Sequence, residues 1–333
     1  MINNSSKEAK TKESWVDAIT IWLKRYKVEV VIFILGLIFI NLIFIPETFR
    51  ETNTVNGASA GQLGDFVGGY IGTILTLLSV LLFYSTLTHQ RETASIEKFE
   101  TKYFELLKMH RENVAEIGIG EDFGRKIFVI LIREFREIHK ITKELAIQEN
   151  QQANQEVFNN KDIFIMSYYA LYFGTGPNSS RILSGVLSKY PKKFVTTLIS
   201  NLDDHKLKLR IKNRRKFKFT PFEGHQSRLG HYYRHLYQTI CYVDQSKYDI
   251  NKYEYIKTIR AQLTTHEQAL LYINSLTPLG ENWWHRNLIK KYKLVKNIPY
   301  DFFDSKTEID ITKEFPDHYF EWQTNSSIKT IIQ

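Results

Sequence analysis

Two long apolar runs lie near the N-terminus of the chain. Residues 28–45 read VEVVIFILGLIFINLIFI and carry one charge, Glu29, at the edge of the run. Residues 66–87 read FVGGYIGTILTLLSVLLFYSTL and carry none. A helix of 18 residues covers about 27 Å, which is close to the hydrocarbon thickness of a bilayer. Because no polar stripe interrupts the first run, a transmembrane helix is favoured over a buried core helix.

A row of small residues runs along the second apolar segment. Gly64, Gly68 and Gly72 repeat every four positions, and Thr76 continues the row. Small residues at this spacing let a second helix approach closely, either the first span or a copy from another subunit. The alternative is that glycine is simply common in membrane helices. The row predicts helix packing, and with it a homo-oligomer formed through the transmembrane helices.

The distribution of charge predicts the orientation in the membrane. Lysines and an arginine crowd the segment 1–27, whereas the connector over 46–65 carries few charges. By the positive-inside rule, both termini face the cytoplasm and 46–65 is a short external loop of a bacterial inner (plasma) membrane protein. The small residues at 58–60 have the form of a cleavage site, but a second apolar run follows, so no cleaved signal peptide is expected.

Beyond the second run the chain keeps a helical period. Apolar residues recur at threes and fours over 88–117, which predicts a helical stalk continuous with the second span. GIGED at 118–122 ends it, and a helical cytoplasmic domain over 118–296 follows. Its helices are expected at about 124–149, 162–173, 226–243, 250–275 and 279–296, with two short helices separated by Pro191. The tail over 297–333 is unassigned, and the fold class is all-α.

One stretch departs from this period. Residues 206–219 read KLKLRIKNRRKFKF, in which basic and apolar residues alternate, and this pattern predicts a short β-hairpin or an extended arm. Its basic side is either a solvated face or a site for lipid headgroups or nucleic acid. The anion-binding candidates are Lys206, Lys208, Arg210, Lys212, Arg214, Arg215, Lys216 and Lys218.

Composition narrows the functional classes. The formal net charge is +9, so membrane lipids and RNA are both candidate partners. Cys241 is the only cysteine, which excludes an intrachain disulfide and suits a reducing compartment. The sequence contains neither a GxGxxG nor a GxxxxGK[ST] motif, which argues against an ATPase. No cofactor and no metal are expected.

Three blocks carry a family resemblance. They are GQLGDFVGGYIGTILTLLSVLLFYSTLTHQRE at 61–92, FEGHQSRLGHYYRHLYQTICYVDQ at 222–245 and YIKTIRAQLTTHEQALLYINSL at 255–276. In their order and amino-acid sequence they resemble the phage abortive infection proteins of the AbiC type, over roughly 61–292. The resemblance implies a bacterial antiviral protein with membrane spans before a helical cytoplasmic region. It supplies no catalytic residues.

The stretch RLGHYYRHLYQ at 228–238 has the most unusual combination of side chains in the chain. On a helix Arg228, His231 and His235 share one face. Arginine followed by histidine after four to six residues is the mark of HEPN-type RNases, and six residues separate Arg228 from His235. In such enzymes histidine acts as general acid or base and arginine stabilises the phosphorane. Similar spacings also occur by composition alone, at Arg133 with His139 and at Arg260 with His266.

Two other interpretations of this stretch remain open. His231 and His235 at i and i+4 are spaced to share a divalent ion, but the glutamate of zinc helices is missing and Arg234 would repel a cation. Alternatively, the side chains form a polar seam that hydrogen-bonds to neighbouring helices, with Glu267 and Gln268 among the acceptors.

The sequence therefore favours a membrane-anchored abortive infection effector that stops phage propagation by membrane disruption or host arrest after sensing infection. The alternatives are a membrane-tethered RNase that uses Arg228 and His235, and a non-enzymatic binder of a phage component. A phage-derived trigger and a product of a neighbouring gene are further expected partners. Whether the chain is an enzyme stays open, with the balance against it.

Overall fold

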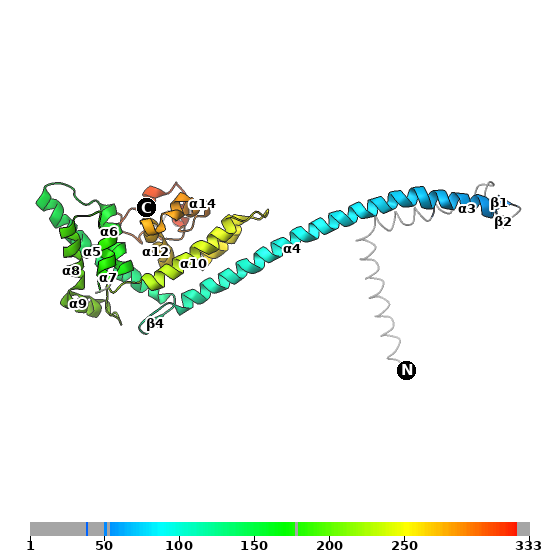
Figure 1. The fold of residues 1–333 in the computed structure, drawn as a ribbon. Helices are drawn as coiled ribbons and strands as arrows, with labels where there is room; N and C mark the ends of the chain where they lie inside the picture. Colours follow the sequence, from blue (N-terminus) through cyan, green and yellow to red (C-terminus); the bar gives the residue numbers. More distant parts are fainter. Residues whose placement is uncertain (1–37, 39–49, 52–53, 177–178, 325–333) are drawn as a thin grey trace, which may run out of the picture. The chain divides into compact units, whose positions relative to one another are not determined.

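The structure, a computed structural model, describes residues 38, 50–51, 54–176 and 179–324. It is mostly helical and contains two small two-stranded hairpins, so the all-α class is correct at this level. The chain divides into two compact units after Ala94. The predicted first span at 28–45 lies, apart from Ile38, outside the described residues. Figure 1 shows the chain and labels many of its helices and strands.

The first unit contains a short hairpin and the start of a long helix. Strand β1 (Arg50–Glu51) pairs antiparallel with β2 (Thr54–Val55). Helix α3 (Gly57–Phe66) begins where the Asn56 side chain accepts hydrogen bonds from the N–H groups of Ala58 and Ser59. The expectation of a loop through residue 65 is therefore wrong from Gly57 onward, because this N-cap starts the helix earlier.

The helix continues through a π-helical turn, η2 (Val67–Ile71), into α4 (Gly72–Glu116). Together these elements form a helix over Gly57–Glu116 that is long and apolar enough, by length and composition, to cross a membrane. Among the described residues, a single helix meets both conditions. In its apolar part the large side chains are exposed on every side, as for Leu75, Leu78 and Leu82.

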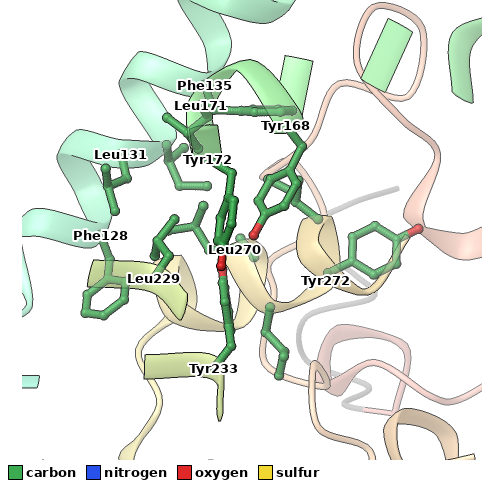
Figure 2. Packing of buried hydrophobic residues seen from close by; sticks show 14 of the residues in the cluster. Phe128, Leu131, Phe135, Tyr168, Leu171, Tyr172, Leu229, Tyr233, Leu270 and Tyr272 are labelled. Carbon is green, nitrogen blue, oxygen red and sulfur yellow. The ribbon is translucent and has the colours of Figure 1, made fainter. Parts of the chain in front are cut away.

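The second unit is built around α5 (Lys126–Ala153). Its apolar residues recur at helical spacing, and Ile127, Leu131, Phe135 and Ile138 are fully buried. Helix α5 packs against α6 (Asn160–Phe173), α8 (Lys192–Asp203) and α12 (Thr265–Ser275). Figure 2 shows Phe128, Leu131 and Phe135 facing residues of α6, α10 and α12 across this core.

Short elements complete the second unit. Strands β3 (Gly118–Ile119) and β4 (Asp122–Phe123) form an antiparallel hairpin directly after α4. The remaining elements are α7 (Ser179–Val186), α9 (His205–Arg215), α10 (Gln226–Asp244), α11 (Lys252–Gln262), η3 (Pro278–Gly280), α13 (Asn282–His285), α14 (Leu288–Tyr292), η4 (Ile311–Glu314) and α15 (Glu321–Thr324).

Three expectations about secondary structure in the second unit are wrong. The helix expected over 279–296 is the three short elements η3, α13 and α14. Of the hairpin or extended arm expected over 206–219, residues 206–215 form a helix, α9, because the Asp204 side chain caps it by accepting from Leu207 N at 2.7 Å. Lys208 and Ile211, three residues apart, are its buried residues, so a helical period was present beneath the alternation. The single helix expected over 250–275 is α11 and α12, separated where Thr264 and Glu267 form a capping box.

Candidate functional site

Helix α10 carries the stretch RLGHYYRHLYQ and turns its core face inward. Leu229, Tyr232, Tyr233, Leu236 and Ile240 follow helical spacing and are all buried. The polar residues of the stretch therefore lie on the two flanks of this face. One flank meets α4 and the β3–β4 hairpin, and the other meets α6, α12 and α13.

On the first flank, Arg228 is held at the start of α10. Its Nε donates to the carbonyl oxygen of Gly118 at 2.7 Å, and its Nη1 lies 3.5 Å from Nδ1 of His225. His225 Nε2 lies 2.8 Å from Glu134 Oε2, and the other oxygen of this fully buried carboxylate accepts from Phe222 N. The guanidinium is thus part of a network that fixes the backbone on both sides of α10.

His235 faces the other way along the same flank, toward α4. Its ring stacks on that of His110 with centroids 6.1 Å apart, and no described residue offers a hydrogen bond to the four ring nitrogens. Burial, followed by repulsion from His235 and Arg125, lowers the pKa of His110 to about 4. Burial first, and then His231, lowers the pKa of His235. Both imidazoles are therefore neutral near pH 7.

The three residues singled out from the sequence do not converge on one point. Arg228 bonds to Gly118, His235 stacks on His110, and His231 lies exposed with Nε2 3.4 Å from Asn113 Oδ1. Two helical turns separate Arg228 from His235, about 10 Å along the axis. Within the part of the chain that the structure describes, no cluster of three His, Cys, Asp or Glu side chains is arranged to hold a metal ion.

The glycine row lies on an open helix surface. A Cβ atom built at Gly64 or Gly68 meets no described atom within 4 Å, and one at Gly72 meets only Val67 O, at 3.9 Å. Thr76 donates its hydroxyl to the carbonyl oxygen of Gly72 at 2.8 Å. The π-turn η2 lies within the row. Because a π-turn is wider than an α-turn, residues four apart drift less around the axis there.

The basic residues of 206–219 divide into two groups. Four bind acidic side chains: Lys208 contacts Asp203 and Glu223, Arg214 and Arg215 contact Glu137, and Lys218 contacts Glu121. No described acidic group pairs with the other four, which are Lys206, Arg210, Lys212 and Lys216. Half of the predicted anion-binding set is therefore engaged within the fold.

The second flank of α10 lines a pocket of about 230 Å³. Two glycines keep it open. A Cβ at Gly230 would lie 2.8 Å from the hydroxyl of Tyr172, and one at Gly280 would lie 2.4 Å from the carbonyl oxygen of Asn274. Its lining consists of Tyr172, Gly230, Tyr233, Arg234, Tyr237, Asn274, Leu279, Gly280, Asn282 and Trp283.

Buried polar groups lie beside this pocket. The Tyr233 side chain is 7% exposed, and its hydroxyl is buried. The hydroxyl is near those of Tyr168 and Tyr172, which act on the pKa of Tyr233, and burial, the first cause, raises that pKa. Figure 2 shows these three rings turned toward one another. Asn274 donates from Nδ2 to Tyr168 at 2.9 Å.

The comparisons with known proteins point to this same region. Residues 224–303 match the family model described as Putative phage abortive infection protein. Over this segment the chain is similar to that family. No curated protein and no solved structure matches the chain. Every residue that lines the pocket, apart from Tyr172, lies in the matched segment 224–303.

The sequence singled out one flank of α10 and missed the other. Arg234 and Tyr233 stand beside the selected residues, but Asn274 and Trp283, which line the same pocket, come from later helices. The signal that was present is the resemblance itself, because the blocks at 222–245 and 255–276 supply α10 and α12. Residues from both blocks line the pocket.

Proposed function

We propose that the protein is a membrane-anchored abortive infection effector that acts at the bilayer after its helical domain senses infection. The observation that carries the proposal is the apolar helix over Gly57–Glu116. Its most apolar window of 18 residues has a mean hydropathy of 2.1 and is not buried at all by the described chain. Apolar surface on this scale is stable only when lipid or other helices cover it.

The exposed positions extend around the whole helix. They run almost without interruption and therefore point in every direction, because each residue turns the helix by about 100°. The exposed large side chains are Ile74, Leu75, Leu77, Leu78, Val80, Leu81, Leu82, Phe83 and Tyr84. A surface helix of a soluble protein would keep one polar face, so a bilayer is the better match.

The glycine row supports a role beyond anchoring. A single anchor needs only length and apolarity, whereas the open surface at Gly64 and Gly68 permits close contact between helix backbones. We propose that this contact joins copies of the chain in the inner membrane, with both termini cytoplasmic, and that its rearrangement disrupts the membrane or arrests the host.

The RNase alternative has less support. An acid or base and a charge-stabilising arginine must reach the same phosphate. Arg228 instead bonds to a backbone carbonyl, and His235 turns to His110. The alternative of a non-enzymatic binder is compatible with the pocket between α10, α12 and α13.

The experiment compares two glycine variants in phage-challenged cells. Gly68→Ile blocks close helix contact, while Gly185→Ile is the matched control, because Gly185 in α7 also has no described neighbour within 4 Å of a built Cβ. With equal amounts of protein in the membrane fraction, Gly68→Ile is expected to abolish protection and Gly185→Ile to retain it. Full protection by Gly68→Ile would exclude close helix packing as the mechanism.

A further inference from the structure

We propose that the outer surface of α7, α8 and α9 binds a nucleic acid duplex through its phosphate backbone. Its charge, its exposure and the engagement of its acidic neighbours point to this partner, and none of them depends on the membrane mechanism. The three helices are consecutive in sequence, and α8 packs against both of the others. Helix α7 also packs on α6 and α8 on α5, so the three helices form a layer on the outside of these two core helices (Figure 1).

The segment that forms this layer carries the positive charge of the chain. Residues 179–220 contain twelve Lys and Arg against two Asp, which is a net charge of +10. The whole chain contains 45 Lys and Arg against 36 Asp and Glu, which is a net charge of +9. The rest of the chain is therefore close to neutral. Positive charge concentrated in one part of a surface is the electrostatic footprint of a site for a polyanion.

The acidic groups around the layer are engaged within the fold. Asp203 contacts the buried Lys208 at 2.7 Å, and Asp204 accepts from Leu207 N as the N-cap of α9. Acidic residues of other elements each contact a basic residue of α9 or of the turn that follows it, and they are Glu121, Glu137 and Glu223. These contacts hold α9 in place and leave its outer cations without a neutralising neighbour among them.

Eight cations of the layer are exposed or partly exposed, and no described acidic group pairs with them. They are Arg181, Lys189, Lys192, Lys193, Lys206, Arg210, Lys212 and Lys216. On α9, Lys206 and Arg210 lie one turn apart, about 6 Å along the axis. Long side chains at such positions reach separate phosphates and release the counterions that surround a duplex.

The placement of the aromatic rings favours a duplex over a single strand. Sites for single strands combine a basic groove with exposed rings on which the bases stack. Within 179–220, Tyr190, Phe194 and Phe217 are buried, and Phe219 stacks on Phe217 with ring centroids 5.2 Å apart. A duplex keeps its bases stacked inside and presents its phosphates, for which cations suffice.

The apolar residues of the layer favour nucleic acid over a bilayer surface. A helix that lies on a bilayer buries one apolar face among the lipid chains and keeps its cations on the other. The buried residues of α9 are Lys208 and Ile211, which pack within the fold, and its large exposed apolar side chain is Leu209. Helix α7 adds Ile182 and Val186. Eight cations beside three aliphatic side chains make a surface for phosphates with little apolar area to enter a membrane.

The test measures the binding of fluorescently labelled nucleic acids to the purified full chain in detergent micelles by fluorescence anisotropy. A DNA duplex of about two helical turns, an RNA duplex of the same sequence and a single strand of the same length are compared at about 50 and 200 mM salt.

Two variants lose the same charge at different places. The surface variant combines Lys192→Gln, Lys193→Gln, Lys206→Gln and Arg210→Gln. The control variant combines Lys98→Gln, Lys140→Gln, Lys247→Gln and Lys306→Gln, at exposed positions outside 179–220. Thermal unfolding verifies that both variants keep the fold, and the salt dependence and strand preference of the wild type need no variant.

At least one of the two duplexes is expected to bind the wild type and the control variant within about threefold of each other, because exposed charges more than about 10 Å away are screened. The surface variant should bind that duplex at least about tenfold more weakly at about 50 mM salt. Its slope of log affinity against log salt should be shallower by about 2 to 4. The single strand should bind the wild type more weakly than the duplex, and the two duplexes together identify DNA or RNA as the tighter partner.

Four results would overturn the proposal. Three of them are no binding of either duplex, an equal loss of binding in the surface and control variants, and a single strand that binds as tightly as the duplex. The fourth is complete displacement of the duplex by an anionic phospholipid, added in mixed micelles at an equal concentration of phosphate groups, which would assign the surface to the bilayer. Gly68→Ile should bind the duplex normally, so a failure of this surface is distinguishable from a failure of the membrane mechanism.

Discussion

The Nε atom of Arg228 donates to the carbonyl oxygen of Gly118 at 2.7 Å and thereby ties the first turn of α10 to the β3–β4 hairpin. This bond gives the arginine a structural role. It also directs the guanidinium toward His225, three residues earlier, and not toward His235, seven residues later.

Arg228→Gln should lower the stability of the fold without any change in RNA. A charged hydrogen bond to a backbone carbonyl is lost, which costs about 1–2 kcal/mol at this half-buried position. Thermal unfolding of the full chain, followed by tryptophan fluorescence, measures the loss, and Arg210→Gln serves as the exposed control. An unchanged melting temperature for Arg228→Gln would show that the contact with Gly118 contributes nothing.

Glu134→Leu should be more severe. The carboxylate is fully buried, accepts from Phe222 N and contacts His225, so its removal leaves two buried polar groups without partners. The expected loss is about 3–5 kcal/mol. Glu144→Leu, at an exposed position of the same helix, controls for helix propensity and hydrophobicity. Equal unfolding of the two variants in urea would contradict the buried network.

The stability of the second unit should fall as the pH drops from about 6.5 to about 4. Burial lowers the pKa of His110 to about 4, so below pH 6.5 the unfolded chain binds a proton that the folded chain rejects. The stabilisation is fully present above the ordinary pKa of 6.5 and is lost as the pH falls to about 4. It amounts to about 3 kcal/mol.

His110→Phe keeps a ring in this place and should flatten the pH dependence of unfolding between pH 7.5 and 4.5. His205→Phe, at an exposed position, should leave the dependence unchanged. Burial also lowers the pKa of His139, His235 and His266, so a residual slope is expected. The same slope in wild type and His110→Phe would refute the assignment to His110.

Helix α9 contains one buried and one exposed lysine, and their substitution should affect stability differently. Lys208 is buried and contacts Asp203 at 2.7 Å and Glu223 at 2.9 Å, whereas Lys206 is exposed. Lys208→Met should destabilise the fold by about 1–2 kcal/mol, less than a fully buried pair because both carboxylates are half exposed. Lys206→Met should leave the melting temperature unchanged. Reversed effects would mean that the salt bridges of Lys208 do not support the fold.

Periodic patterns made much of the fold predictable. The apolar spacing of α5 and α10 specifies both helices and their buried faces, and the resembling blocks lie largely in the segment that matches the family model. The alternation in α9 misled, because a pattern of period two over a few residues is compatible with a helix once Asp204 caps it. Only the packing of Lys208 and Ile211 against the rest of the fold decides between a strand and a helix.

The pocket could not be predicted in the same way. Tyr172, Gly230, Asn274 and Trp283 lie on four different elements, and no local spacing relates them. The stacking of His235 on His110 joins residues from α10 and α4 in a similar manner. Such sites depend on how helices cross, which local periodicity does not encode.

The most direct test of the membrane mechanism is a single time course in phage-infected cells that carry the wild-type chain. Membrane potential is followed with a voltage-sensitive dye, and total RNA integrity is followed in the same samples, with Gly68→Ile as the inactive comparison. Early depolarisation with intact RNA, absent in Gly68→Ile, is the predicted result. Fragmentation of RNA before any loss of potential would contradict the account and return Arg228 and His235 to consideration as catalytic residues.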